Sequence, residues 1–312
     1  MIKEQIQASR DIKPSSLRTY LSTLKSLSKQ LGNDKFDDLT IFQQYDNVIK
    51  AIVDRPITSK KNVLTAILVV LKSQNDVSDN IIELYSNELK KLNDEYNTFL
   101  QEQSKTPKQA ENWITVEEYK ETIDKIHHQV KALKLQNESV IDDNDMMLLQ
   151  SLVILMVYLH FPIRNNFSDM KIINSREVKR IDKTDNYLVI QGNKKYFDLN
   201  DFKNVDRIGP KILKVPTVLN KLINLWLKFN TTGYFLINKN HSPMSPNSIT
   251  KFLNKIFQKY LNKTVSTSMI RHVMISDKLE GMPTIKEEQQ RAKDIENTFL
   301  HSKPINDIYR KV

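Results

Sequence analysis

Residues 152–172 read LVILMVYLHFPIRNNFSDMKI, and this stretch decides how the second half of the chain is interpreted. The apolar run reaches back to Met146 and forward to Phe161, where Pro162 stops it. Such a run, almost without polar residues, predicts a helix that is buried on all sides. It is too short to cross a bilayer. Arg164 follows at once, so a cation lies at the end of a buried helix.

Composition narrows the class of protein. The chain has 312 residues, enough for two domains at roughly 150 residues each. With 39% hydrophobic and 27% charged residues, it is typical of a soluble globular protein. Cysteine is absent, which excludes disulfides, thiolate zinc sites and cysteine nucleophiles. The 5 glycines form no glycine-rich phosphate-binding motif, and the N-terminal MIKEQIQASRD is too polar for a signal peptide.

The first third of the chain predicts a bundle of helices. Apolar residues recur at helical spacing from Leu17 to Leu27, and further helices are expected from about Ser59 and Asp79. Residues 102–112, EQSKTPKQAEN, are polar, contain a proline and lack periodicity. We therefore predict a helical domain at residues 1–105, a linker at residues 106–112 and a second domain at residues 113–312.

The second domain combines helices with a small sheet. Thr115 and Glu118 form a capping-box pattern that starts a helix, and Ser245-Pro246 starts another. Three short strands are expected at residues 187–190, 196–199 and 212–216, separated by turn signals at Gly192-Asn193 and Gly209-Pro210. The predicted fold is mainly α, with a helical N-terminal domain and a mostly helical second domain that holds a three-stranded antiparallel sheet.

Positive charge is concentrated beyond the first domain. Residues 1–105 carry 15 Lys and Arg against 14 Asp and Glu, whereas residues 106–312 carry 32 against 23. An excess of this kind favours a polyanionic partner, most simply nucleic acid. A lysine-rich solvated surface explains the same numbers equally well.

Four short features of the second domain bear on chemistry. They are Arg164, Ser268-Met269-Ile270-Arg271-His272, Leu300-His301-Ser302 and Ile308-Tyr309-Arg310. Taken singly, each has an ordinary structural explanation. Arginines pair with helix ends, histidines are often hydrogen-bonded in cores, and a tyrosine near a terminus often packs as an amphipathic side chain.

Taken in order, these features resemble the tyrosine recombinase (phage-integrase-like) family. The matching segments are LVILMVYLHFPIRNNFSDMKI, STSMIRHVMIS and FLHSKPINDIYRKV, with Tyr309 eight residues after His301. The resemblance covers about residues 113–312 as a catalytic domain, and SSLRTYLSTLKSL is similar to the opening of the family's core-binding domain. The stretch NDFKNVDRIGPKILKVP is similar to recombinases of virophages, large eukaryotic DNA viruses and related mobile elements.

The resemblance implies a role for each residue. Tyr309 is the expected nucleophile, which attacks a DNA phosphodiester and forms a 3′-phosphotyrosyl link. Arg164 and Arg271 would hold the non-bridging oxygens, where guanidinium geometry suits a phosphate. His301 would hydrogen-bond the same phosphate, and a lysine would protonate the departing 5′-oxygen. No metal or other cofactor is implied.

The identity of the lysine is left open. In the family it lies near the turn between the second and third strands, and Lys203 fits that position best. Lys194 and Lys195, at the earlier turn, are the alternatives. Each is more often a solvated surface lysine than a catalytic one.

The sequence departs from the family pattern at three places. Ser268 stands where the family has a histidine three residues before the arginine, and serine is neither a cation nor a good base near neutral pH. His272 matches a family position of mainly structural use. The stretch between Arg271 and His301 is long and charged, which predicts a loop or an added helix. The given sequence also ends three residues after Tyr309, where family members often extend onto a neighbouring protomer.

The leading functional hypothesis is site-specific DNA recombination or integration. The implied partners are double-stranded DNA and further copies of the chain, two to four on DNA, with no membrane. An intracellular site of action is implied, without deciding between cytoplasm, host nucleus and virion. Three alternatives stay open: a type IB topoisomerase, a DNA-binding protein with a decayed site, and a helical interaction scaffold.

Overall fold

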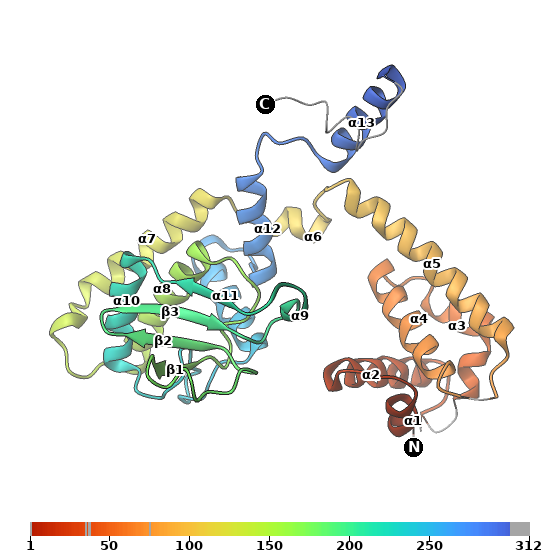
Figure 1. The fold of residues 1–312 in the computed structure, drawn as a ribbon, viewed down its shortest axis with the longest axis horizontal. Helices are drawn as coiled ribbons and strands as arrows, with labels where there is room; N and C mark the ends of the chain where they lie inside the picture. Colours follow the sequence, from red (N-terminus) through yellow and green to blue (C-terminus); the bar gives the residue numbers. More distant parts are fainter. Residues whose placement is uncertain (1, 35, 37–38, 75, 300–312) are drawn as a thin grey trace. The chain divides into compact units, whose positions relative to one another are not determined.

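The computed structural model describes residues 2–34, 36, 39–74 and 76–299 (Figure 1). The chain forms two compact units. One contains residues up to Ser104 together with the segment that begins at Pro283, and the other spans Lys105–Met282. The segment expected to be a linker contains a short helix, α6 (Pro107–Asn112), which belongs to the second unit. Helix α6 forms there because Thr106 and Gln109 make a capping box.

The first unit is helical, as the periodicity predicts. Its elements are α1 (Ile2–Ser9), α2 (Pro14–Gln30), α3 (Tyr45–Ile52), α4 (Ile57–Leu71), α5 (Asp79–Gln101) and α13 (Ile285–Phe299). Helix α4 supplies the largest share of the core, because every residue from Ala66 to Leu71 is apolar and buried. The hydroxyl of the buried Tyr85 donates a hydrogen bond to the Phe42 carbonyl at 2.7 Å, which satisfies its polar end.

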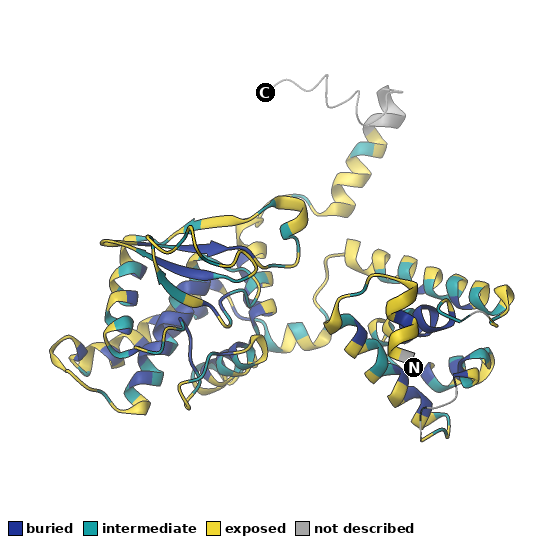
Figure 2. Ribbon diagram, turned by 60° about the horizontal axis from the view of Figure 1, so that its bottom comes forward, coloured by how far each residue is buried: buried dark blue, intermediate teal, exposed yellow. Residues whose placement is uncertain are grey.

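The second unit is built around α8 (Asp143–His160), the buried apolar helix that the sequence predicts. Its helices are α6, α7 (Val116–Ala132), α8 (Asp143–His160), the short α9 (Val205–Ile208), α10 (Thr217–Phe229), α11 (Pro246–Leu261) and α12 (Thr267–Lys278). Helix α8 packs against α7, α10 and α12, and its apolar residues are mostly buried (Figure 2). The buried Gln150 side chain is paired in both directions with the Ile237 backbone, at 2.9 and 2.8 Å.

Two predicted helix starts are confirmed in detail. Thr115 and Glu118 form a capping box at the start of α7. The Ser245 hydroxyl accepts a hydrogen bond from the Ser248 N–H, and Pro246 opens α11. In both cases the side chain satisfies backbone N–H groups that have no partner within the helix.

The sheet of the second unit has four strands and is mixed, so the prediction of a three-stranded antiparallel sheet is wrong. The strands are β1 (Lys171–Asn174), β2 (Tyr187–Gln191), β3 (Lys194–Leu199) and β4 (Lys211–Lys214), in that order across the sheet. Strand β1 pairs in parallel with β2, and the other two pairings are antiparallel. The sequence pattern missed β1 because this four-residue strand shows no alternation of buried and exposed side chains. Hydrogen bonds with residues 233–235 cover its outer edge.

No helix among the described residues is both long and apolar enough to cross a membrane.

Candidate active site

A pocket of about 290 Å³ lies in the second unit where four parts of the chain meet. These parts are the loop after α8, the segment from the end of β3 through α9, the start of β4, and α12. The polar lining residues are Arg164, Asn166, Asn204, Lys211 and Arg271. The apolar ones are Pro162, Ile163, Leu199, Phe202, Ile208, Leu213 and Ile275.

The pocket brings positively charged side chains together without negatively charged partners. Arg164 and Arg271 both line it, although they are far apart in the chain. Burial lowers the pKa of Arg271, and the positive charge of Arg164 lowers it further. Among the described residues, no carboxylate lines the pocket, and neither arginine forms an ion pair. Two guanidinium groups held together in this way favour an anion that can bridge them.

The loop that carries Arg164 is fixed on both sides by aromatic packing. Phe161 and Phe167 flank the loop, and both rings contact Phe197 of β3, at centroid distances of 5.6 and 5.0 Å. Pro162 ends helix α8 because it cannot continue the helical hydrogen bonding. The loop therefore leaves the core at a defined point, and Arg164 is exposed at its tip.

Asn165 fixes the same loop by hydrogen bonds. Its side-chain amide donates to the Pro246 carbonyl at 2.7 Å and to the Thr250 hydroxyl at 3.1 Å, at the start of α11. Its Oδ1 accepts from the Tyr158 hydroxyl of α8 at 3.3 Å. In the sequence, the only feature that points to Asn165 is its place beside Arg164.

Helix α12 places Arg271 in the pocket. Its N-terminus is capped by Ser266, whose hydroxyl accepts a hydrogen bond from the Met269 N–H at 3.3 Å. Val273 and Met274 are buried, which fixes the rotation of the helix and leaves Arg271 half-buried at the pocket. Ile275, one turn further on, lines the pocket with it.

Ser268 and His272 are both exposed on α12, and neither lines the pocket. Ser268 lies three residues before Arg271 and hence on the same side of the helix. His272 is displaced from Arg271 by about 100° around the helix axis. His272 therefore lies on a different face of α12 from Arg271.

The structure does not bring the preferred lysine to the arginines. Lys203 lines an adjoining hollow, which shares Asn166 and Phe202 with the arginine pocket and is also lined by Asp169, Asp185 and Asp201. Lys211, the first residue of β4, lines the arginine pocket instead. It directly follows the Gly209-Pro210 turn, which was the available signal. The reason for the difference is α9: this single helical turn lies between Lys203 and β4, so the two lysines face different surroundings.

The two alternative lysines lie elsewhere. Lys194 is exposed at the first residue of β3. Lys195 is 4% exposed, and its Nζ donates to Oδ1 of Asn220, at 3.0 Å, and to Oδ1 of Asn224. Burial lowers the pKa of Lys195. This lysine is held against α10 and does not line the arginine pocket.

His301 and Tyr309 lie outside the residues that the structure describes. Among the described residues, no three metal-ligating side chains gather into a group that could hold a metal ion. The described part of the site therefore consists of two arginines, one lysine and their supports.

The sequence matches no protein-family model and no curated protein. Among solved structures, the chain is similar to one described as "Crystal structure of XerA recombinase", with a TM-score of 0.35 and 11% identity. The match covers 92% of this chain and 86% of that one. A likeness this distant does not show membership of a family, so the resemblance drawn from the sequence remains a prediction.

Proposed function

We propose that the chain cuts and rejoins DNA through a 3′-phosphotyrosyl intermediate on Tyr309. The observation that carries the proposal is the meeting of Arg164 and Arg271 in one pocket that no described carboxylate lines. These are the two arginines that the resemblance marks as phosphate ligands. A DNA phosphodiester supplies the single anion that two guanidinium groups can share.

In the proposed reaction the Tyr309 oxygen bonds to phosphorus as the bond from phosphorus to the 5′-oxygen breaks. The arginines stabilise the charge that develops on the non-bridging oxygens, an effect strengthened by the apolar walls of the pocket. A phenol has an ordinary pKa of about 10, so nearby cations also help it to lose its proton. His301 would hydrogen-bond the phosphate. The phosphotyrosyl bond keeps the energy needed for rejoining.

We propose Lys211, in place of Lys203, as the acid that protonates the 5′-oxygen. Lys211 shares the pocket with both arginines, whereas Lys203 lines an adjoining hollow whose lining also includes three aspartates. Proton transfer requires hydrogen-bonding distance to the leaving oxygen, so position in the pocket decides between the two lysines.

The finer functional assignment rests on the sequence resemblance. We propose site-specific recombination or integration, with several protomers on double-stranded DNA and the N-terminal helical unit serving as a second DNA-binding element. Membership in the group found in virophages and large DNA viruses is the most specific form of this proposal. A topoisomerase that relaxes supercoils is the alternative with the same chemistry, and a decayed DNA-binding protein is the alternative that Ser268 favours.

A pool of nicked duplexes with randomised sequence tests the proposal without knowledge of the target site. The nick lets the cut fragment diffuse away, so a covalent protein–DNA adduct accumulates. We expect adduct with the wild-type chain in the presence of EDTA and none with Tyr309→Phe, while both bind DNA equally. Adduct with Tyr309→Phe would contradict the assigned nucleophile, and a strict metal requirement would contradict the mechanism.

A further inference from the structure

Asn186 uses the full hydrogen-bonding capacity of its side-chain amide. Its Nδ2 donates to the Asn166 carbonyl at 3.1 Å and to the Asp201 carbonyl at 2.9 Å. Its Oδ1 accepts from the N–H groups of Asn200 and Asp201, both at 2.9 Å. An amide has two N–H donors and two acceptor lone pairs, so no other neutral side chain of this size can replace all four bonds.

These four bonds join two segments that line the arginine pocket. One is the loop of residues 164–166, which contributes Arg164 and Asn166. The other begins at Asn200 and Asp201 and contributes Phe202 and Asn204. The Asn166 side chain adds a direct link, since it donates to the Asp201 carbonyl at 3.3 Å.

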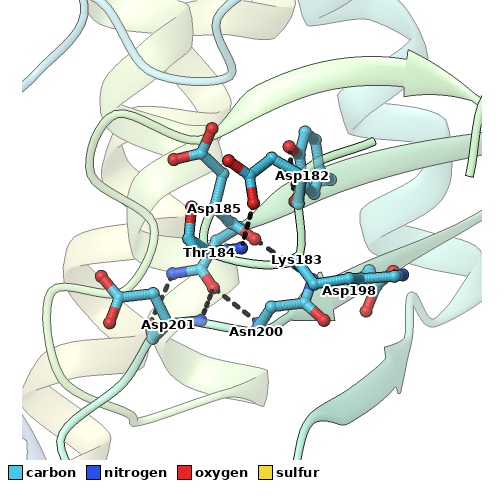
Figure 3. Close-up of polar contacts among 9 residues, drawn as sticks. Asp182, Lys183, Thr184, Asp185, Asp198, Asn200 and Asp201 are labelled. Atoms are coloured by element: carbon cyan, nitrogen blue, oxygen red, sulfur yellow. Dashed lines mark hydrogen bonds and ion pairs between the residues drawn. The ribbon is translucent and has the colours of Figure 1, made fainter. Parts of the chain in front are cut away.

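The segment that precedes Asn186 is itself well anchored, and Figure 3 shows its residues Asp182–Asp185 beside Asn200 and Asp201. Asn186 immediately precedes β2, whose first residue, Tyr187, is buried and donates its hydroxyl hydrogen bond to the Asp182 carbonyl at 2.8 Å. The Asn200 side chain donates to the Asp185 carbonyl at 3.1 Å. A side chain on such a support can hold two loops at a fixed separation.

We propose that Asn186 is a positioning residue that sets where Arg164 stands relative to the rest of the phosphate pocket. It lines no part of that pocket and acts through the Asn166 backbone, two residues beyond Arg164. The catalytic consequence rests on the proposed function. The effect on anion binding does not, because it follows from the geometry of the two arginines.

The two halves of the amide can be separated by mutation. Asn186→Asp keeps an oxygen to accept from Asn200 and Asp201 but loses both donors, and its carboxylate repels the carbonyls of Asn166 and Asp201. The Arg164 loop then loses its bond to residue 186, while the segment after β3 keeps the bonds from its N–H groups. Asn186→Ala removes the bonds to both segments without adding a charge, which separates loss of position from the effect of a new carboxylate near Arg164.

Asn238 provides the matched control. It is also a half-buried asparagine of the second unit, and its side chain donates to the Pro243 carbonyl at 2.9 Å. Asn238→Asp makes the same chemical change in a turn that does not line the pocket. Thermal unfolding of the three variants shows whether each is folded at the temperature of the assay.

The first readout is the binding of inorganic phosphate, followed through the arginine Nε–H NMR signals, with Arg164→Lys used for assignment. In the wild type we expect Arg164 and Arg271 to shift together. In Asn186→Asp and Asn186→Ala the Arg164 shift should need about tenfold more phosphate or more, a loss typical of removed supporting contacts, and Asn238→Asp should match the wild type. Equal affinities, or no phosphate response at Arg164 in the wild type, would overturn the inference.

The second readout is the rate of adduct formation on the nicked pool. A displacement of about 1 Å can cost about 10²-fold in rate, so both Asn186 variants should slow the chemical step with little change in DNA affinity. Adding Asn186→Asp to Arg164→Ala should cause no further loss, because Asn186 acts through Arg164. A multiplied loss in the double variant would show a general structural role instead. Absence of adduct in the wild type would contradict the proposed function alone, and the phosphate titration would still decide the role of Asn186.

Discussion

The positively charged side chains of the pocket determine its chemistry. Among the described residues, no negatively charged side chain in the pocket neutralises them. Arg271 is half-buried beside Arg164, with no described carboxylate in the pocket to neutralise either. Like charges at close range destabilise the folded state. Residues kept in such an arrangement are typical of functional sites, where a ligand supplies the missing charge.

Replacing Arg271 should therefore separate stability from activity. Arg271→Met retains the apolar part of the side chain and removes the charge. We expect its Tm to stay within about 2 °C of the wild type or to rise, because repulsion with Arg164 is relieved. The rate of adduct formation should fall by about 10²–10³-fold, as for a lost transition-state contact.

Arg180→Ala, on the loop between β1 and β2, is the control for Arg271, and it should keep the wild-type rate. Calorimetry and the adduct assay check the pair of results. A Tm that falls by many degrees together with an unchanged rate would assign Arg271 a structural role.

Single substitutions also test whether Lys211 or Lys203 protonates the 5′-oxygen. With sulfur in place of the bridging 5′-oxygen, the leaving group needs no proton. We expect this substrate to restore adduct formation by Lys211→Ala to within about tenfold of the wild type. Lys203→Ala should be close to the wild type on both substrates. Restoration of Lys203→Ala, from a large initial loss, would reverse the assignment.

At the scale of elements, local sequence rules predicted much of the fold and less of the site. Helix α8, the capping box at Thr115 and the start of α11 at Ser245 follow from patterns within a few residues. Strand β1 could not be predicted, because it exists only through pairing with β2 and residues 233–235. Lys211 was missed for a similar reason: the short helix α9 decides which lysine faces the arginines.

The contact between β3 and α10 predicts how the stability of the fold depends on pH. The buried Lys195 joins the two elements, and burial lowers its pKa below the ordinary lysine value. A lysine with a lowered pKa in the folded state binds fewer protons folded than unfolded in the range between the two pKa values. Stability from this group is therefore greatest above the unfolded value and is lost as pH falls through the folded one.

Denaturant titrations of the wild type and Lys195→Met between pH 7 and 10.5 check this. The unfolding free energy of the wild type minus that of Lys195→Met should increase as pH rises. A difference that is constant with pH, or that moves the other way, would show that Lys195 is not desolvated against α10.

At the scale of the whole molecule, charge gives a prediction that does not depend on the site. Residues 106–312 hold most of the excess positive charge, and the chain as a whole carries +10. If Lys and Arg contact DNA phosphates, counterions are released, and affinity falls steeply with salt. For 6–10 phosphate contacts, we expect a loss of about 10³–10⁵-fold in affinity between 50 and 200 mM salt. Fluorescence anisotropy with a duplex of arbitrary sequence measures the slope, and a flat dependence would contradict DNA as the partner.

The central claim is that the arginine pocket presents a DNA phosphate to Tyr309. The most direct measurement is to digest the protein–DNA adduct with nuclease and protease and to locate the remaining nucleotide by mass spectrometry. The account predicts a 3′-phosphonucleotide on Tyr309, and a sharp loss of that species in Arg164→Ala and Arg271→Ala. A nucleotide on another of the 11 tyrosines, or undiminished labelling of Tyr309 without either arginine, would contradict it.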